Sequence, residues 1–213
     1  MTLTLYYHPL SSYSWKALIA LYENATPFDP VIVDQDTHAA FIEVWPMAKF
    51  PVLVDHDRGE IVPESSIIID YLDFRHPGAV RFTPAEPEGA WRTPLWDRFF
   101  DLHVQSAVQK IVGDRIRPQQ HKDPFGVEDA RAKLSAAYGV LETEAAKRDW
   151  FSDGVFGLAD CAAAPALYYA DKVQPFGDAQ PATRAYLDRL RARPSFARVL
   201  GEAEPYFKLF PTD

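Results

Sequence analysis

The sequence predicts an α/β domain followed by an all-helical domain. In the first third, short segments in which apolar and polar residues alternate, as in a strand, are followed by segments in which apolar residues repeat at the helical period. After Ala90 the strand period disappears and only the helical period remains. A stretch dense in Pro, Gly and Ala separates the two parts, so we expect domains at 1–78 and 90–213 with a linker at 79–89.

The first part follows the order strand, helix, strand, helix, strand, strand, helix. The predicted strands cover residues 2–7, 28–33, 52–54 and 60–62, and the predicted helices cover 12–23, 37–45 and 64–75. A polar stretch that contains Gly59 suits a hairpin between the last two strands. Because helical crossovers join parallel strands and a tight turn joins antiparallel ones, this order implies a mixed sheet.

Apolar residues at helical spacing predict five helices in the second part. The first is long and covers residues 91–112, and the others cover 127–145, 158–172, 181–192 and 195–204. The sequence has no internal repeat and no low-complexity tract.

The composition favours a compact protein. The chain of 213 residues is 47% hydrophobic and 24% charged, which argues against disorder. Its formal charge of −8 disfavours nucleic acid and anionic membranes as main partners. Cys161 is the only cysteine, the start lacks a signal-peptide pattern and no run approaches a membrane span, so we expect a cytoplasmic location. The six histidines form no ligand pattern, so no metal is expected.

Phe50-Pro51 stands at the entrance of a predicted strand, where the missing N–H of proline does least harm. This position favours a cis peptide bond, and an ordinary trans proline at a sheet edge is the alternative. A cis bond would leave the N–H and C=O of Phe50 free to pair with an extended peptide laid alongside.

Glu64 and Ser65 open a predicted helix directly after a strand. Helix N-termini expose unpaired N–H groups and partial positive charge, so they bind carboxylates. Ser65 could hold a carboxylate through its N–H and its hydroxyl, while Glu64 could pair with an ammonium group. Together they would recognise the head of an amino acid, and a plain helix cap is the alternative.

Ser11 and Ser12 lie at the start of the first predicted helix. A hydroxyl there can donate to a sulfur anion, and the helix terminus stabilises the same charge. Both effects lower the pKa of a thiol and increase the population of its nucleophilic anion. The alternative is that these serines only cap the helix.

In this order, the three motifs resemble those of the cytosolic glutathione transferases. The segment 11–16 is most similar to the serine segment of the zeta class, which implies that Ser11 stabilises the glutathione thiolate, with Ser12 beside it. Phe50-Pro51 is similar to the Val-Pro pair that grips the cysteinyl backbone, and Glu64-Ser65 matches the Glu-Ser pair that holds the γ-glutamyl end. The resemblance implies a thioredoxin-like first domain of order βαβαββα, glutathione as co-substrate and a homodimer.

Two further segments match the family with departures. Residues 45–49 keep the Pro and Lys of an Asn-Pro-x-Gly-Lys run. Lys49 and His38 could reach the glycine carboxylate of glutathione, and a solvated surface position is the alternative for each. Residues 156–160 resemble the Phe-Ser-Leu-Ala-Asp segment that opens a buried helix, but Gly157 replaces the serine. Only half of the capping box can then form, with Asp160 as acceptor, so we expect a weaker cap.

The resemblance also implies that the helical domain binds a small apolar electrophile. The first helix of that domain carries four candidates for pocket or core, Trp96, Phe99, Phe100 and His103. Because other classes of the family use a tyrosine hydroxyl, Tyr6 or Tyr7 is the fallback thiolate donor. Glutathione transfer is the leading hypothesis. The alternatives are a glutathione-dependent isomerase similar to maleylacetoacetate isomerase, a reductase, or a non-catalytic binder of apolar ligands or of a partner.

Overall fold

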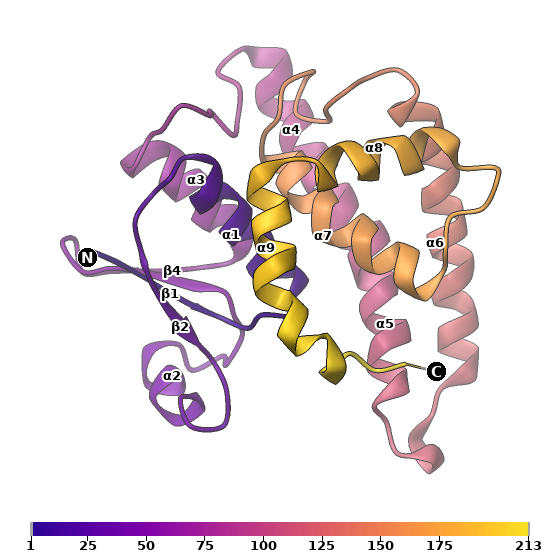
Figure 1. The fold of residues 1–213 in the computed structure, drawn as a ribbon, viewed down its shortest axis with the longest axis horizontal. Helices are drawn as coiled ribbons and strands as arrows, with labels where there is room; N and C mark the ends of the chain where they lie inside the picture. The colour runs from indigo at the N-terminus through magenta and orange to yellow at the C-terminus, as the bar shows by residue number, and fades with distance from the viewer. Residues whose placement is uncertain (1, 213) are drawn as a thin grey trace.

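The computed structural model describes residues 2–212 as a small α/β part joined to a larger helical part (Figure 1). The strands are β1 (Leu3–Tyr7), β2 (Asp29–Ile32), β3 (Val52–Asp55) and β4 (Glu60–Pro63), in the order β2-β1-β3-β4. β1 runs parallel to β2 and antiparallel to β3, and β4 pairs antiparallel with β3. The predicted mixed sheet is therefore confirmed.

The helices of the first part are α1 (Ser12–Glu23), α2 (His38–Val44) and α3 (Ser65–Arg75). No predicted strand or helix in this part differs from the structure by more than one residue at either end. The agreement is close because apolar residues repeat about every 3.6 residues in the helices and every two residues in the neighbouring strands, so the change of period marks each boundary.

The second part consists of helices with one irregular segment. Its elements are α4 (Pro87–Phe99), the π-helix η1 (Phe100–Gln105), α5 (Ser106–Arg115), the 3₁₀ turn η2 (Gln119–His121), α6 (Pro124–Ala145), α7 (Leu158–Val173), α8 (Pro181–Arg191), α9 (Pro194–Ala203) and the 3₁₀ segment η3 (Glu204–Leu209). The predicted helix at 91–112 is thus three consecutive elements. α4 begins inside the predicted linker at 79–89, because Pro87 starts the helix rather than interrupting it.

α1 lies at the centre of the molecule. Its Trp15 is fully buried, with its ring 4.8 Å from that of Tyr169 on α7 and 6.0 Å from that of Phe196 on α9. In Figure 1, α9 runs beside α1. One buried apolar cluster extends from β1 through α1 into α7, α8 and α9. The two parts therefore share a core, which fixes the N-terminus of α1 against the helical part.

The N-terminus of α7 is capped more completely than the sequence predicts. The N–H of Gly157 donates to Asp160 Oδ2 at 3.0 Å, which is the expected half of the box. The N–H of Ala159 donates to the hydroxyl of Ser152 at 3.0 Å. The expected half of the box is therefore confirmed, and a serine from the preceding loop supplies the hydroxyl that position 157 lacks.

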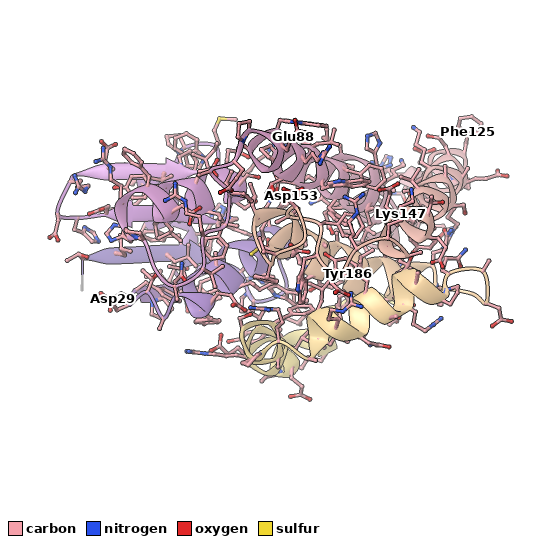
Figure 2. All side chains as sticks on the ribbon, turned by 90° about the horizontal axis from the view of Figure 1, so that it is seen from above. Asp29, Glu88, Phe125, Lys147, Asp153 and Tyr186 are labelled. Carbon is pink, nitrogen blue, oxygen red and sulfur yellow. The ribbon has the colours of Figure 1, made fainter. Side chains whose placement is uncertain are left out.

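The molecule is elongated. Figure 2 shows Asp29, on β2, and Phe125, at the start of α6, at opposite ends of its long axis. None of the helices within residues 2–212 is both long and apolar enough to cross a bilayer.

Candidate active site

A cavity of about 640 Å³ collects most of the residues that the three motifs predict. Those that line it are Ser11, Lys49, Phe50, Pro51, Glu64 and Ser65. Ser12 does not line it and faces a second cavity instead. His38 lies elsewhere, in a shallow hollow on the other side of Phe50 with Val33 and Asp34.

Ser11 is the N-cap of α1. Its backbone is extended, and its Oγ accepts a hydrogen bond from the N–H of Ser14 at 3.2 Å. Because capping uses only a lone pair, the hydroxyl hydrogen remains able to donate to an anion in the cavity. The first N–H groups of α1 give this end of the helix a partial positive charge, which attracts an anion.

The Phe50–Pro51 bond is cis and lies directly before β3. The ring of Phe50 stacks on that of His8, with 5.7 Å between the ring centroids. No residue within 2–212 hydrogen-bonds the backbone N–H or C=O of Phe50. Both groups are therefore open to an extended peptide in the cavity.

Glu64 has an unusual backbone conformation at the start of α3. Its φ is +68° and its ψ is 118°, values that L-residues rarely adopt. A conformation of this kind costs about 1–3 kcal/mol and is found most often at ligand sites. Ser65, the next residue, is the first of α3 and is buried at the wall of the cavity. The chain thus retains a strained residue at the point where an amino-acid head would bind.

A buried ion cluster that the sequence analysis did not find lies against the same cavity. Lys16 Nζ, on α1, is 3.1 Å from Asp101 Oδ2 and 2.7 Å from Ser66 Oγ, and it also pairs with Asp97. Ser66 and Asp101 both line the cavity. Burial raises the pKa of Asp101, Lys16 opposes this change, and the negative charge of Asp97 adds to it.

The available signal for this cluster was weak. Lys16 falls on an otherwise apolar helix, and Asp97 and Asp101 are four residues apart within a segment rich in aromatic side chains. Such polar residues at core positions indicate buried pairs. The sequence does not say which residue each would meet, since Lys16 and Asp101 are 85 positions apart.

The tyrosines of the site differ from the expected ones. Tyr6 stacks on Phe41 and Tyr7 packs against the main core, and neither lines either cavity described here. Tyr13, which the sequence analysis did not consider, lines the larger cavity. Burial, followed by the negative charge of Asp101, raises the pKa of Tyr13 to about 12. It is a neutral hydroxyl at physiological pH.

A second cavity of about 450 Å³ adjoins the first and is mainly apolar. Its apolar wall is formed by Leu10, Val108, Val112, Tyr169 and Phe210. Ser11, Phe50 and Gln109 line both cavities, so the two meet at the N-cap of α1. Burial lowers the pKa of His8, which also lines this cavity and is therefore mostly neutral at pH 7.

None of the four aromatic candidates on α4 and η1 lines this apolar cavity. Trp96 and Phe100 are core residues, with rings packed on that of Phe151 at 4.8 and 5.3 Å. Phe99 packs between Trp96 and His103, and His103 faces a different hollow beside α6. Trp96 and Phe100 turn toward the core of the helical part because Phe151 covers that face.

Cys161 has no site role in the structure. Cys161 is fully buried, and burial raises the pKa of its thiol well above the ordinary value, so it is unreactive. Among the residues from 2 to 212, no group of three His, Cys, Asp or Glu side chains could hold a metal ion.

Comparison with known proteins gives consistent matches over both parts. Residues 5–80 match the family model described as the glutathione S-transferase N-terminal domain, and residues 96–194 match that of the C-terminal domain. Glutathione S-transferase GstB of Escherichia coli K12 is 25% identical, with 87% of this chain and 91% of that protein covered. FtsZ-localized protein A of Caulobacter vibrioides is 29% identical, with 95% and 92% covered.

A solved structure shows the same fold. It is a glutathione S-transferase from Methylobacillus flagellatus KT with GSH bound, 25% identical to this chain. The two superpose with a TM-score of 0.83 over 92% of this chain and 98% of that one.

Proposed function

Since the chain belongs to the glutathione S-transferase family, we propose that Ser11 stabilises the glutathione thiolate for attack on a small apolar electrophile. The protein is an enzyme of the glutathione transferase type, with glutathione as its co-substrate. The observation that carries the proposal for Ser11 is its position. It lines both the larger cavity and the apolar cavity, at the N-cap of α1.

The physical basis is stabilisation of a sulfur anion. The Ser11 hydroxyl donates a hydrogen bond to the sulfur, and the N-terminus of α1 adds partial positive charge. Both interactions favour the anion over the thiol, so they lower the pKa of the thiol. The neutral hydroxyl of Tyr13 adds no negative charge that would oppose this.

The larger cavity supplies groups for each end of the tripeptide. Glu64 and Ser65 bind the α-amino and α-carboxylate groups of the γ-glutamyl end. The free backbone groups of Phe50 pair with the cysteinyl unit, and Lys49 binds the glycine carboxylate. This assignment is supported by the presence of all four residues in one cavity. Ser12, in the adjoining cavity, contributes to the wall near the sulfur.

We place the glutathione domain at 1–78 and the second-substrate domain at 90–213, with the linker between them. The family matches at 5–80 and 96–194 support this division. We also propose a homodimer in the cytoplasm. Exposed apolar side chains on β4, α3, α4 and η1 support the dimer, namely Ile61, Ile67, Phe74, Trp91, Leu95 and Leu102.

A non-catalytic role in binding a partner is the second candidate. The observation that favours it is the 29% identity to a relative named for its localization with FtsZ. The retained hydroxyl at the N-cap of α1 favours the enzyme, because a pure docking protein does not need a thiolate donor there. Isomerisation and reduction use the same bound thiolate and share its test.

The test is a titration of the purified protein with glutathione while thiolate absorbance is followed against pH. We expect the thiol pKa of bound glutathione to lie at least one unit below its solution value, and to rise in Ser11→Ala. Ser12→Ala is the matched control and should leave the pKa nearer to that of the wild type. Binding of glutathione with an unshifted thiol pKa would favour the second candidate.

A further inference from the structure

Gln105 is a buried amide without a hydrogen-bond partner. Its side chain is only 5% exposed, and its Oε1 is fully enclosed. Within residues 2–212 neither end of the amide makes a hydrogen bond. An unpaired buried polar group costs about 1–3 kcal/mol, so the residue is not explained by stability.

The amide faces the apolar cavity that adjoins Ser11. Gln105 lines this cavity, and because Oε1 is enclosed, the Nε2 end is the one that reaches it. Of the other polar side chains in the wall, Ser11 is assigned to the thiolate and Ser12 lies next to it, while Tyr169 and His8 are engaged. The hydroxyl of Tyr169 donates to the carbonyl of Leu10 at 2.8 Å, and Nδ1 of His8 accepts from the N–H of Leu10. Gln109 is exposed to solvent. Gln105 therefore offers the cavity a donor shielded from water.

The local backbone explains how the side chain reaches this position. Gln105 is the last residue of the π-helix η1, in which the N–H of Ser106 donates to the carbonyl of Asp101, five residues earlier. π-Helical turns are rare and occur frequently at functional sites. The wide turn lets Asp101 line the glutathione cavity while Gln105 lines the apolar one. The π-helix η1 therefore contributes one side chain to each cavity.

We infer that Gln105 determines specificity for the second substrate, and that it selects apolar electrophiles activated by a conjugated carbonyl group. This inference rests on the proposed function. The amide N–H donates to the carbonyl oxygen, which is a hydrogen-bond acceptor within an otherwise apolar molecule. A hydrocarbon halide offers no comparable acceptor, so it gains nothing from Gln105.

The reaction strengthens this hydrogen bond. The thiolate forms a bond to the β-carbon, the C=C electron pair shifts, and negative charge develops on the carbonyl oxygen. A proton from water then adds to the α-carbon and restores the carbonyl. Because the charge on oxygen is greatest after the S–C bond forms, a shielded N–H stabilises the transition state more than the ground state.

The first experiment compares two substrates in two proteins. An apolar enone, 4-phenylbut-3-en-2-one, and a halide, benzyl chloride, are conjugated to glutathione by the wild type and by Gln105→Met. We expect kcat/KM for the enone to fall by about 10- to 100-fold in the variant, with less than about a threefold change for benzyl chloride. The KM for glutathione should not change. Equal losses for both substrates, or no loss for the enone, would overturn the inference.

A binding experiment separates this inference from the proposed function. The unreactive ketone 4-phenylbutan-2-one and the hydrocarbon butylbenzene are titrated into both proteins by calorimetry. We expect the ketone alone to lose affinity in Gln105→Met, by about tenfold. A wild type that conjugates neither substrate yet shows this ketone preference contradicts the transferase mechanism and supports the inference. Equal binding of the ketone by both proteins overturns the inference, whatever the activity.

Discussion

Lys16 Nζ lies 3.1 Å from Oδ2 of Asp101, and this ion pair joins α1 of the first part to η1 of the second. Lys16 is 1% exposed and also pairs with the buried carboxylate of Asp97. The hydroxyl of Ser66, at the start of α3, accepts from Lys16 and donates to Asp97. Four helical segments, α1, α3, α4 and η1, are therefore held together around one cation directly beside the glutathione cavity.

Removing that cation leaves the buried carboxylate of Asp97 without a counter-ion and leaves Asp101 only the exposed guanidinium of Arg98, at 3.5 Å. We expect Lys16→Met to lower the free energy of unfolding by about 3–5 kcal/mol, because a buried pair that loses one partner leaves an uncompensated charge. Urea denaturation at pH 7 measures the change. The matched control is Lys133→Met, which breaks the exposed pair with Asp129 at 2.7 Å and should cost less than about 1 kcal/mol. Similar losses in both variants would show that Lys16 does not neutralise buried charge.

We expect Glu64 to lower the stability of the folded protein and to increase its affinity for glutathione. Its φ of +68° is unfavourable for any residue with a Cβ, so we expect Glu64→Gly to be at least as stable as the wild type. The same change removes the carboxylate proposed to bind the ammonium group, so the Kd for glutathione should rise by about tenfold or more. Glu64→Gln separates the two effects, since it keeps the strained backbone and loses only the charge. A marked loss of stability in Glu64→Gly would contradict this account.

The fold could be predicted closely because it rests on local periodicity. Runs with period two and period 3.6 alternate in the first part, and the chain order alone then implies a mixed sheet. The segments around Ser11, Phe50 and Glu64 could be identified for a similar reason. Each is a short stretch whose residue types are tied to a strand end or a helix start.

What could not be predicted depends on contacts between distant segments. The apolar cavity takes Leu10 from the first part, Val108 from α5 and Phe210 from the C-terminal segment. Trp96 and Phe100 were equally apolar candidates, but Phe151 covers them. An apolar side chain is expected to be buried, but the sequence does not show which residues bury it. The π-helical turn also has no periodic signal, so the position of Gln105 was not foreseen.

Glu142 should make stability depend on pH. This α6 residue accepts from the N–H groups of Ala182 and Thr183 at the start of α8, each at 2.9 Å. Burial by itself would raise the pKa of Glu142, but these hydrogen bonds and that from the Thr183 hydroxyl bring it below its ordinary value. A carboxyl with a lowered folded pKa stabilises the protein above its unfolded pKa, and that contribution is lost as the pH falls through the folded pKa.

We therefore expect Glu142→Gln to be less stable than the wild type by about 1 kcal/mol at pH 7. The difference should stay constant down to about pH 5.5 and shrink below about pH 4.5, where the wild-type carboxyl becomes protonated. Denaturation curves of both proteins between pH 3.5 and 7, at intervals of roughly half a unit, measure it. A difference that grows as the pH falls would contradict the proposed role of the charged carboxylate.

The cap of α7 requires glycine at position 157. A Cβ there would lie 2.3 Å from the carbonyl oxygen of Phe82 and 2.8 Å from the Oγ of Ser152. The Phe82 oxygen is backbone and accepts from the N–H of Leu158, so it cannot move without breaking that hydrogen bond. We expect Gly157→Ala to lower the free energy of unfolding by about 1–3 kcal/mol, as overpacking does elsewhere. The control is Gly139→Ala on α6, where a Cβ meets nothing within 4 Å and the higher helix propensity of alanine should stabilise the protein by about 0.5–1 kcal/mol. A Gly157→Ala variant at least as stable as the wild type, measured by urea denaturation, would mean that Ser152 and Phe82 can yield and that glycine is not required.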